Sequence, residues 1–134
     1  MDERLSLGDG LVVWRVLIVD DFSAVRHLLR NALEALPEFQ VCGEADNGEV
    51  GIEQACKLKP HAIILDISMP VMNGLDAAKI LRSLFPEIKI VMFTTFEHAN
   101  LSDTVSAQGA NAVVSKTSSP ATLARILREL LRPA

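Results

Sequence analysis

Hydrophobic residues along this chain gather in short continuous runs, separated by longer stretches in which they recur every three or four positions. The runs are rich in Val and Ile, which is typical of strands buried on both faces of a parallel sheet. They predict strands at 12–19, 39–43, 62–66, 88–93 and 112–115. The amphipathic stretches predict helices at about 23–36, 49–59, 74–84, 99–108 and 120–131.

Capping residues and helix breakers mark the ends of these helices. Ser23 is expected to cap the first helix, and Ser119 with Pro120 behind it the last. The expected stops are Pro37, Pro60, Pro86 and Gly109. Strands that alternate with helices across short connections predict parallel pairing, right-handed crossovers and helices on both sheet faces. The sequence therefore predicts a doubly wound α/β fold with a five-stranded parallel sheet and five helices.

Composition adds limits on the class of protein. The 134 residues suffice for one domain, expected at 13–134, with residues 1–12 as a flexible extension. A formal charge of −4 gives no general attraction to nucleic acid or to a membrane surface. No apolar run approaches the roughly 20 residues that span a bilayer, and no signal peptide is recognisable. We therefore expect a cytoplasmic location without membrane contact, and Cys42 and Cys56 as small core residues.

Polar residues follow four of the five predicted strands. Asp20 and Asp21 come after the first strand, Asp66 after the third, Thr94 after the fourth and Lys116 after the fifth. In a sheet of order 2-1-3-4-5 the first and third strands are neighbours at the switch point, so the three carboxylates should meet there. Clustered carboxylates repel one another unless a cation lies among them, and oxygen ligands suit Mg²⁺. A lysine and a hydroxyl across the cleft could receive a phosphoryl group.

Taken singly, each of these residues has an ordinary explanation. Asp20 or Asp21 could cap the first helix, and Asp66 could be a turn residue. Lys116 could be a solvated lysine, and Thr94 is a β-branched residue in an expected strand. The joint placement is what favours a site, because all five lie at the carboxyl ends of strands.

The segments around these residues resemble the receiver domains of response regulators in bacterial two-component systems. The matching segments are 16–21 (Val-Leu-Ile-Val-Asp-Asp), 64–74 (Ile-Leu-Asp-Ile-Ser-Met-Pro-Val-Met-Asn-Gly), 91–94 (Val-Met-Phe-Thr), and Gly109-Ala110 with Lys116. The resemblance implies a flavodoxin-like fold. It also implies that Asp66 is the phosphoacceptor, which takes a phosphoryl group from a sensor histidine kinase or a small phosphodonor.

The same resemblance assigns roles to the other site residues. It implies that Asp21 and Asp66 are side-chain ligands of Mg²⁺, that Asp20 acts largely through water, and that Ser68 lends its backbone carbonyl. It implies that the Thr94 hydroxyl turns toward the phosphoryl group and that Lys116 pairs with it. Phosphorylation would then switch a partner surface. The chain would not be an enzyme beyond its own phosphorylation and dephosphorylation.

Two positions depart from the usual pattern of the family. Val113 stands where an aromatic residue is usual, three before the lysine, and a valine cannot swing or expose a ring. Thr117 replaces the proline that commonly follows the lysine. The second departure is compatible with receivers of LuxR-type transcription factors, which the turn at 43–48 also resembles. By this likeness the chain could dimerise on phosphorylation, and DNA would be reached only through an output domain absent from this chain.

Other classes of protein share parts of this pattern. A pseudo-receiver, which is an unphosphorylated interaction scaffold of the same fold, is the main alternative, and Val113 mildly favours it. A phosphatase of the haloacid dehalogenase type should carry Asp-x-Asp, whereas Asp66-Ile67-Ser68 lacks the second acid. A nucleotide- or flavin-binding fold should carry a glycine-rich phosphate loop, either Gly-x-Gly-x-x-Gly or Gly-x₄-Gly-Lys-Ser/Thr. Neither motif occurs in this sequence.

Overall fold

The computed structural model of this chain describes residues 5–6, 12–95 and 109–133. Its strands are β1 (Leu5–Ser6), β2 (Val12–Val19), β3 (Phe39–Ala45), β4 (Ala62–Leu65), β5 (Lys89–Thr94) and β6 (Ala112–Ser115). Its helices are α1 (Ser23–Glu34), α2 (Gly48–Leu58), α3 (Gly74–Leu84) and α5 (Pro120–Leu131).

The five longer strands form a parallel sheet around β2. β2 pairs with β3 and with β4, and β5 and β6 follow β4 outward. Numbered among themselves, these strands have the order 2-1-3-4-5, so the predicted parallel sheet is confirmed. β1, a strand that was not predicted from the sequence, adds a short antiparallel pairing of Leu5 opposite Val13 and Ser6 opposite Val12. The flexible extension expected at residues 1–12 stays a prediction.

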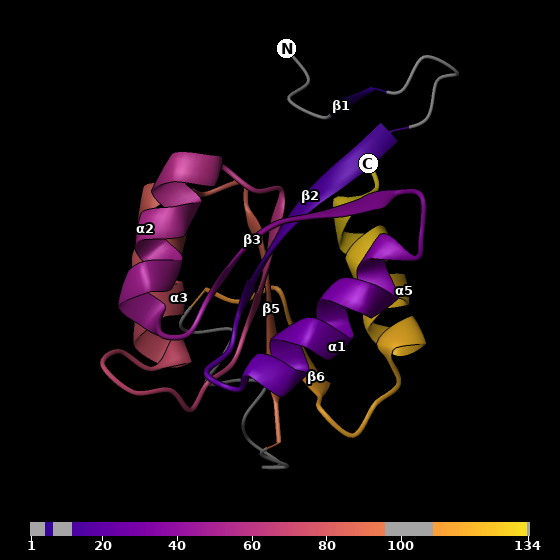
Figure 1. The fold of residues 1–134 in the computed structure, drawn as a ribbon. Coiled ribbons are helices and arrows are strands. Elements are labelled where there is room, and N and C mark those ends of the chain that lie inside the picture. The colour runs from indigo at the N-terminus through magenta and orange to yellow at the C-terminus, as the bar shows by residue number, and fades with distance from the viewer. Residues whose placement is uncertain (1–4, 7–11, 96–108, 134) are drawn as a thin grey trace.

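Helices cover both faces of the sheet, as Figure 1 shows. α1 and α5 lie side by side on one face, and α2 and α3 lie on the other. The described part of the chain holds four helices rather than the five predicted. The remaining one, expected at 99–108, lies outside the described residues.

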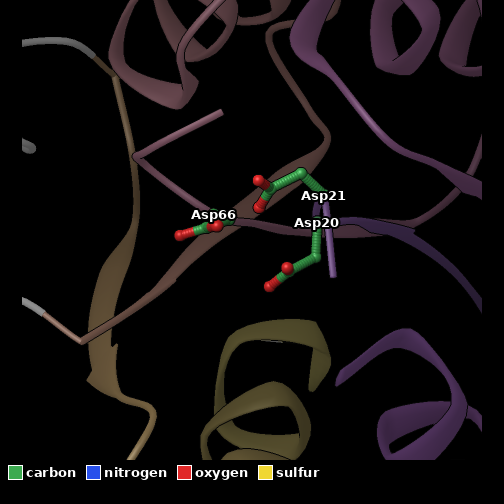
Figure 2. Close-up of side chains that lie close together, drawn as sticks. All are labelled: Asp20, Asp21 and Asp66. Atoms are coloured by element: carbon green, nitrogen blue, oxygen red, sulfur yellow. The ribbon is translucent and has the colours of Figure 1, made fainter. Parts of the chain in front are cut away.

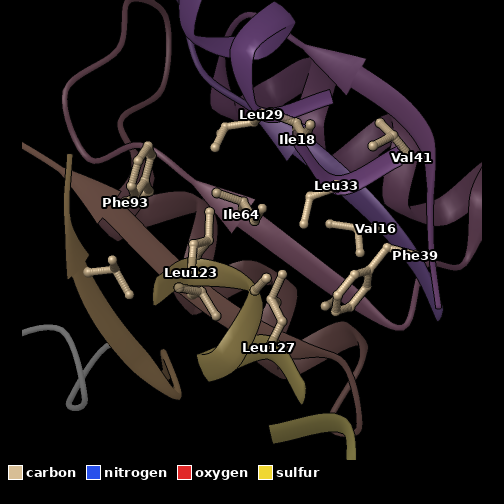
Figure 3. Packing of buried hydrophobic residues seen from close by; sticks show 14 of the residues in the cluster. Val16, Ile18, Leu29, Leu33, Phe39, Val41, Ile64, Phe93, Leu123 and Leu127 are labelled. Atoms are coloured by element: carbon tan, nitrogen blue, oxygen red, sulfur yellow. The ribbon is translucent and has the colours of Figure 1, made fainter. Parts of the chain in front are cut away.

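The hydrophobic core is divided by the sheet into two layers, because successive side chains of a strand point to opposite faces. From β2, Val16 and Ile18 pack toward α1 and α5, while Leu17 and Val19 pack toward α2 and α3. All four are fully buried, and each such side chain contributes about 2 kcal/mol. Figure 3 shows the first layer, in which Ile18 of β2 and Leu123 of α5 take part.

Side chains cap three of the described helices; the cap predicted for the last helix is confirmed, and the one predicted for α1 is not. The side chains of Asn47, Asn73 and Ser119 accept hydrogen bonds from backbone N–H groups in the first turns of α2, α3 and α5. The expectation that Ser23 caps α1 is wrong, because Ser23 is already helical and the N-cap is Phe22, whose side chain makes no capping bond. The Phe22 N–H instead donates to Asp20 Oδ1 at 2.9 Å.

A bulge in β3 interrupts its pairing with the middle of β2. Val41 is opposite Val16 but Gly43 is opposite Leu17, so Cys42 is an extra residue in the ladder. Cys42 is half-buried, and burial raises the pKa of its thiol despite the opposing effect of Arg15. Cys56 is exposed, so the prediction that both cysteines are core residues is wrong for Cys56.

Candidate functional site

The carboxyl ends of β2 and β4 bring the three predicted carboxylates together. The Asp66 N–H donates to the Val19 carbonyl at 2.9 Å, and the Asp20 N–H donates to the Ala45 carbonyl at 3.0 Å. These bonds extend the sheet pairing by one step and place Asp20 beside Asp66. One oxygen from each of Asp20, Asp21 and Asp66 lies within 4.8 Å of the others. Figure 2 shows the three side chains projecting from adjacent strand ends.

Lys116 lies between two of these carboxylates. Its N–H donates to the Thr94 carbonyl at 2.8 Å, which fixes the backbone directly beyond β6. Its Nζ lies 2.7 Å from Asp20 Oδ2 and 3.3 Å from Asp66 Oδ2. The side chain is only 10% exposed, so water screens these ion pairs weakly. Lys116 therefore neutralises part of the charge that Asp20 and Asp66 bring to the cleft.

Asp66 has a strongly perturbed carboxyl group. Burial, followed by repulsion from Asp20, raises its pKa from 3.8 to about 6, although Lys116 and a hydrogen bond from the Ser68 backbone act in the opposite direction. The group is still mostly ionised at pH 7 and can act as a nucleophile there. A buried, ionised carboxylate facing a second one is costly without a further cation.

Asp21 supplies the observation that points to such a cation. Its Oδ1 is buried and has no hydrogen-bond partner among the described residues. A buried carboxylate oxygen without a partner costs about 1–3 kcal/mol or more, so a ligand for it is expected. Three clustered carboxylates form an all-oxygen donor set, and this set fits Mg²⁺ better than a softer transition metal.

The remaining predicted residues, Thr94 and Ser68, lie at the same edge of the sheet. Thr94 ends β5 and is buried, and its carbonyl accepts the bond from the Lys116 N–H described above. Ser68 is exposed in the loop that leads from Asp66 to α3, two residues after the acid. Both positions therefore belong to the surroundings of Asp66, and the roles of the Thr94 hydroxyl and the Ser68 carbonyl stay predictions.

The loop after Asp66 explains why the sequence carries Asn73-Gly74 there. The Gly74 N–H donates to the Ile67 carbonyl at 2.7 Å, so the loop folds back tightly on itself. A Cβ at position 74 would overlap the Asp66 carbonyl oxygen, which no side chain can do without moving the backbone. At the tip, Val71 has a φ of 67°, and the Met72 N–H donates to the Pro70 carbonyl at 2.7 Å. Glycine at 74 thus permits the close packing that holds Asp66.

Three further residues contact the site and were not singled out from the sequence. Arg26 donates from Nη1 to the Asp20 carbonyl at 2.7 Å, and its Nε lies 3.0 Å from Glu44 Oε1. Lys116 Nζ lies 5.7 Å from the centre of the exposed Phe22 ring. Sequence spacing offers no signal for the Arg26–Glu44 pair, because its partners come from α1 and β3.

The doubly wound fold, with three carboxylates and a lysine at its strand ends, is the architecture of a receiver domain. Comparison with known protein families leads to the same class. The family model of the response regulator receiver domain matches residues 16–128. The chain belongs to the response regulator receiver domain family.

Curated relatives extend well beyond the matched region. A protein-glutamate methylesterase/protein-glutamine glutaminase from Idiomarina loihiensis is 42% identical over 98 residues, which cover 73% of this chain and 25% of that protein. The transcriptional regulatory protein LnrK from Bacillus subtilis is 33% identical over 111 residues, covering 83% of this chain and 50% of that protein. This chain thus spans between a quarter and a half of these two relatives.

Solved structures of receiver domains superpose closely. The response regulator domain of Thermotoga maritima CheB is 28% identical with a TM-score of 0.84, covering 91% of this chain and 98% of that one. The isolated REC domain of RcsB from Salmonella enterica, solved with the phosphomimetic BeF₃⁻, is 27% identical with a TM-score of 0.81, covering 88% of each chain. Within the described residues, no helix has the length and apolar character needed to cross a membrane.

Proposed function

We propose that Asp66 is the phosphoacceptor of a two-component phosphorelay and that this chain switches a partner surface or an attached output when it is phosphorylated. The observation that carries the proposal is the Asp66 carboxylate itself. It is buried beside Asp20, with Lys116 Nζ between the two carboxylates, and the Asp21 carboxylate, one oxygen of which is buried without a partner, belongs to the same cluster. A structural acid would not need this concentration of charge at a strand end.

The reaction is a transfer of a phosphoryl group from a phosphohistidine of a sensor histidine kinase. An Asp66 oxygen forms the new bond to phosphorus while the phosphorus–nitrogen bond breaks, and the imidazole leaves with the electron pair. Mg²⁺, held by Asp21, Asp66 and the Ser68 carbonyl with Asp20 acting largely through water, would supply charge neutralisation for the phosphoryl oxygens. Lys116 adds a fixed positive charge, so catalysis consists of positioning and electrostatics.

Phosphorylation of Asp66 then has to change the protein surface that a partner contacts. Lys116 then exchanges its ion pair with Asp66 for one with the phosphoryl group, and the Thr94 hydroxyl is proposed to turn toward the same group. Val113, half-buried on β6, cannot relay this movement with a ring. The switch is therefore proposed to act without an aromatic ring at this position, with dimerisation or a DNA-binding output as the consequence in the whole protein.

The alternative is a pseudo-receiver, which Val113 mildly favours and the presence of all five site residues opposes. Intact-protein mass after incubation with acetyl phosphate and Mg²⁺ separates the two. We expect one phosphoryl adduct on the wild type, none on Asp66→Asn, and an unchanged adduct on the control Asp76→Asn, which alters an exposed acid in the first turn of α3. EDTA should prevent the adduct. A folded wild-type protein without an adduct, or a label that persists in Asp66→Asn, would contradict the proposal.

A further inference from the structure

Every polar group of Asp20 is engaged, and one of its partners comes from α1. Its N–H donates to the Ala45 carbonyl, its Oδ1 accepts from the Phe22 N–H, and its Oδ2 pairs with Lys116. The fourth group, the backbone carbonyl, accepts from Arg26 Nη1 at 2.7 Å. Since this carbonyl belongs to the peptide bond between Asp20 and Asp21, Arg26 holds the link between the two acids.

Arg26 is itself held in place. Its Nε lies 3.0 Å from Glu44 Oε1, and the other oxygen of Glu44 lies 2.7 Å from Arg30 Nε. The Arg26 side chain is 19% exposed. Burial alone would raise the pKa of Glu44, but the hydrogen bonds and charges of Arg30 and Arg26 lower it overall. Glu44 therefore stays ionised and keeps the guanidinium of Arg26 directed at the Asp20 carbonyl.

We propose that Arg26 is a positioning residue for the cation site: its guanidinium fixes the Asp20–Asp21 peptide so that the Asp21 carboxylate meets those of Asp20 and Asp66. The inference rests on the proposed function, because it assumes that the cluster binds Mg²⁺. An arginine suits this role since its planar fork donates in two directions at once, here to a carbonyl and to a carboxylate.

Two effects of Arg26 on cation binding oppose each other. Its positive charge near the acids disfavours a second cation, whereas its hydrogen bond organises the ligands. Removing partners that orient metal ligands typically costs about 10–100-fold in affinity. The charge lies in a network of Arg26 and Arg30 with Glu44 and Glu34 whose formal charges sum to zero, which weakens its field at the site. We therefore expect geometry to dominate, and Mg²⁺ binding to weaken when Arg26 is replaced.

The test is calorimetric titration of Mg²⁺ into the wild type, Arg26→Met, Arg26→Lys and Arg125→Met. Arg26→Met is expected to raise the Kd about 10-fold. Arg26→Lys keeps the charge but offers a single ammonium that cannot span both partners, so its Kd should also rise several-fold. Arg125→Met is the matched control, because Arg125 is an exposed arginine of α5 that pairs with Glu129 and takes no part in the Arg26–Glu44 network; its Kd should stay within about twofold.

A metal-free readout accompanies the titration. Amide hydrogen exchange at Asp21 and Phe22 should accelerate in Arg26→Met without Mg²⁺, while exchange in the core of β4 stays unchanged and shows that the variant is folded.

If the wild type binds no Mg²⁺, the proposed function fails. If it binds and Arg26→Met binds equally well or more tightly, the role of Arg26 is overturned. An Arg26→Lys that matches the wild type while Arg26→Met weakens would also overturn it, by assigning the effect to charge.

Discussion

Replacing Asp66 by Asn is expected to stabilise the metal-free protein at neutral pH and to leave its stability unchanged near pH 4. Asn has the shape of the protonated acid but never ionises, so it avoids the cost of a buried carboxylate facing Asp20. Burial and that repulsion raise the pKa of Asp66 from 3.8 to about 6. Since one pKa unit is worth about 1.4 kcal/mol, the stabilisation should reach about 3 kcal/mol above pH 6.

The sign follows from proton uptake. Between about pH 4 and pH 6 the folded protein holds the Asp66 proton while the unfolded chain has lost it, as the pKa values of about 6 and 3.8 require. The free energy of unfolding of the wild type therefore falls as the pH rises from about 4 to about 6. Above about pH 6 the ionisation of Asp66 no longer changes it. Asp66→Asn lacks this contribution, so the difference between the two proteins grows across the same window.

Urea unfolding in EDTA, followed by circular dichroism at pH 4, 5, 6 and 7.5, measures this difference. Asp76→Asn controls for the removal of one exposed carboxylate. A difference between Asp66→Asn and wild type that is the same at pH 4 and 7.5 would refute the reasoning, because it would mean that burial and repulsion do not set the ionisation of Asp66. Adding Mg²⁺ should then stabilise the wild type more than Asp66→Asn, by mass action on the site.

Three local features yield further predictions. Gly74→Ala should cost about 3 kcal/mol in urea unfolding, because its Cβ would overlap the Asp66 carbonyl oxygen; a loss below about 1 kcal/mol would contradict this packing. Ser119→Ala should cost about 1 kcal/mol by removing the cap of α5, whereas Ser23→Ala should stay within about 0.5 kcal/mol because Ser23 makes no cap. Val71→Gly should raise stability by about 1 kcal/mol, since Val71 has a φ of 67°, and an unchanged or lower Tm would argue against strain at this turn.

The alternation of apolar runs with amphipathic stretches was enough to predict the parallel sheet and most helix bounds, whereas the strand order 2-1-3-4-5 was one of the known doubly wound orders and agrees with the family resemblance. Strand periodicity and helix periodicity are local properties, and they leave few topologies once crossovers must be right-handed. The order 2-1-3-4-5 by itself places Asp20, Asp21 and Asp66 at one edge of the sheet. The cap at Ser119 follows from residue type and position alone.

Tertiary structure decided the features that depend on residues distant in sequence. The bulge at Cys42 arises from the pairing of β3 with β2, and no local sequence pattern predicts an extra residue in the pairing of two strands. Ser23 does not cap α1 because the turn after β2 places Phe22 at the N-cap position. The Arg26–Glu44 pair joins α1 to β3, and the ion pairs of Lys116 join the last strand end to two others. A sequence shows which side chains a strand end carries, but only the packed fold determines which charges meet and how far each is withdrawn from water.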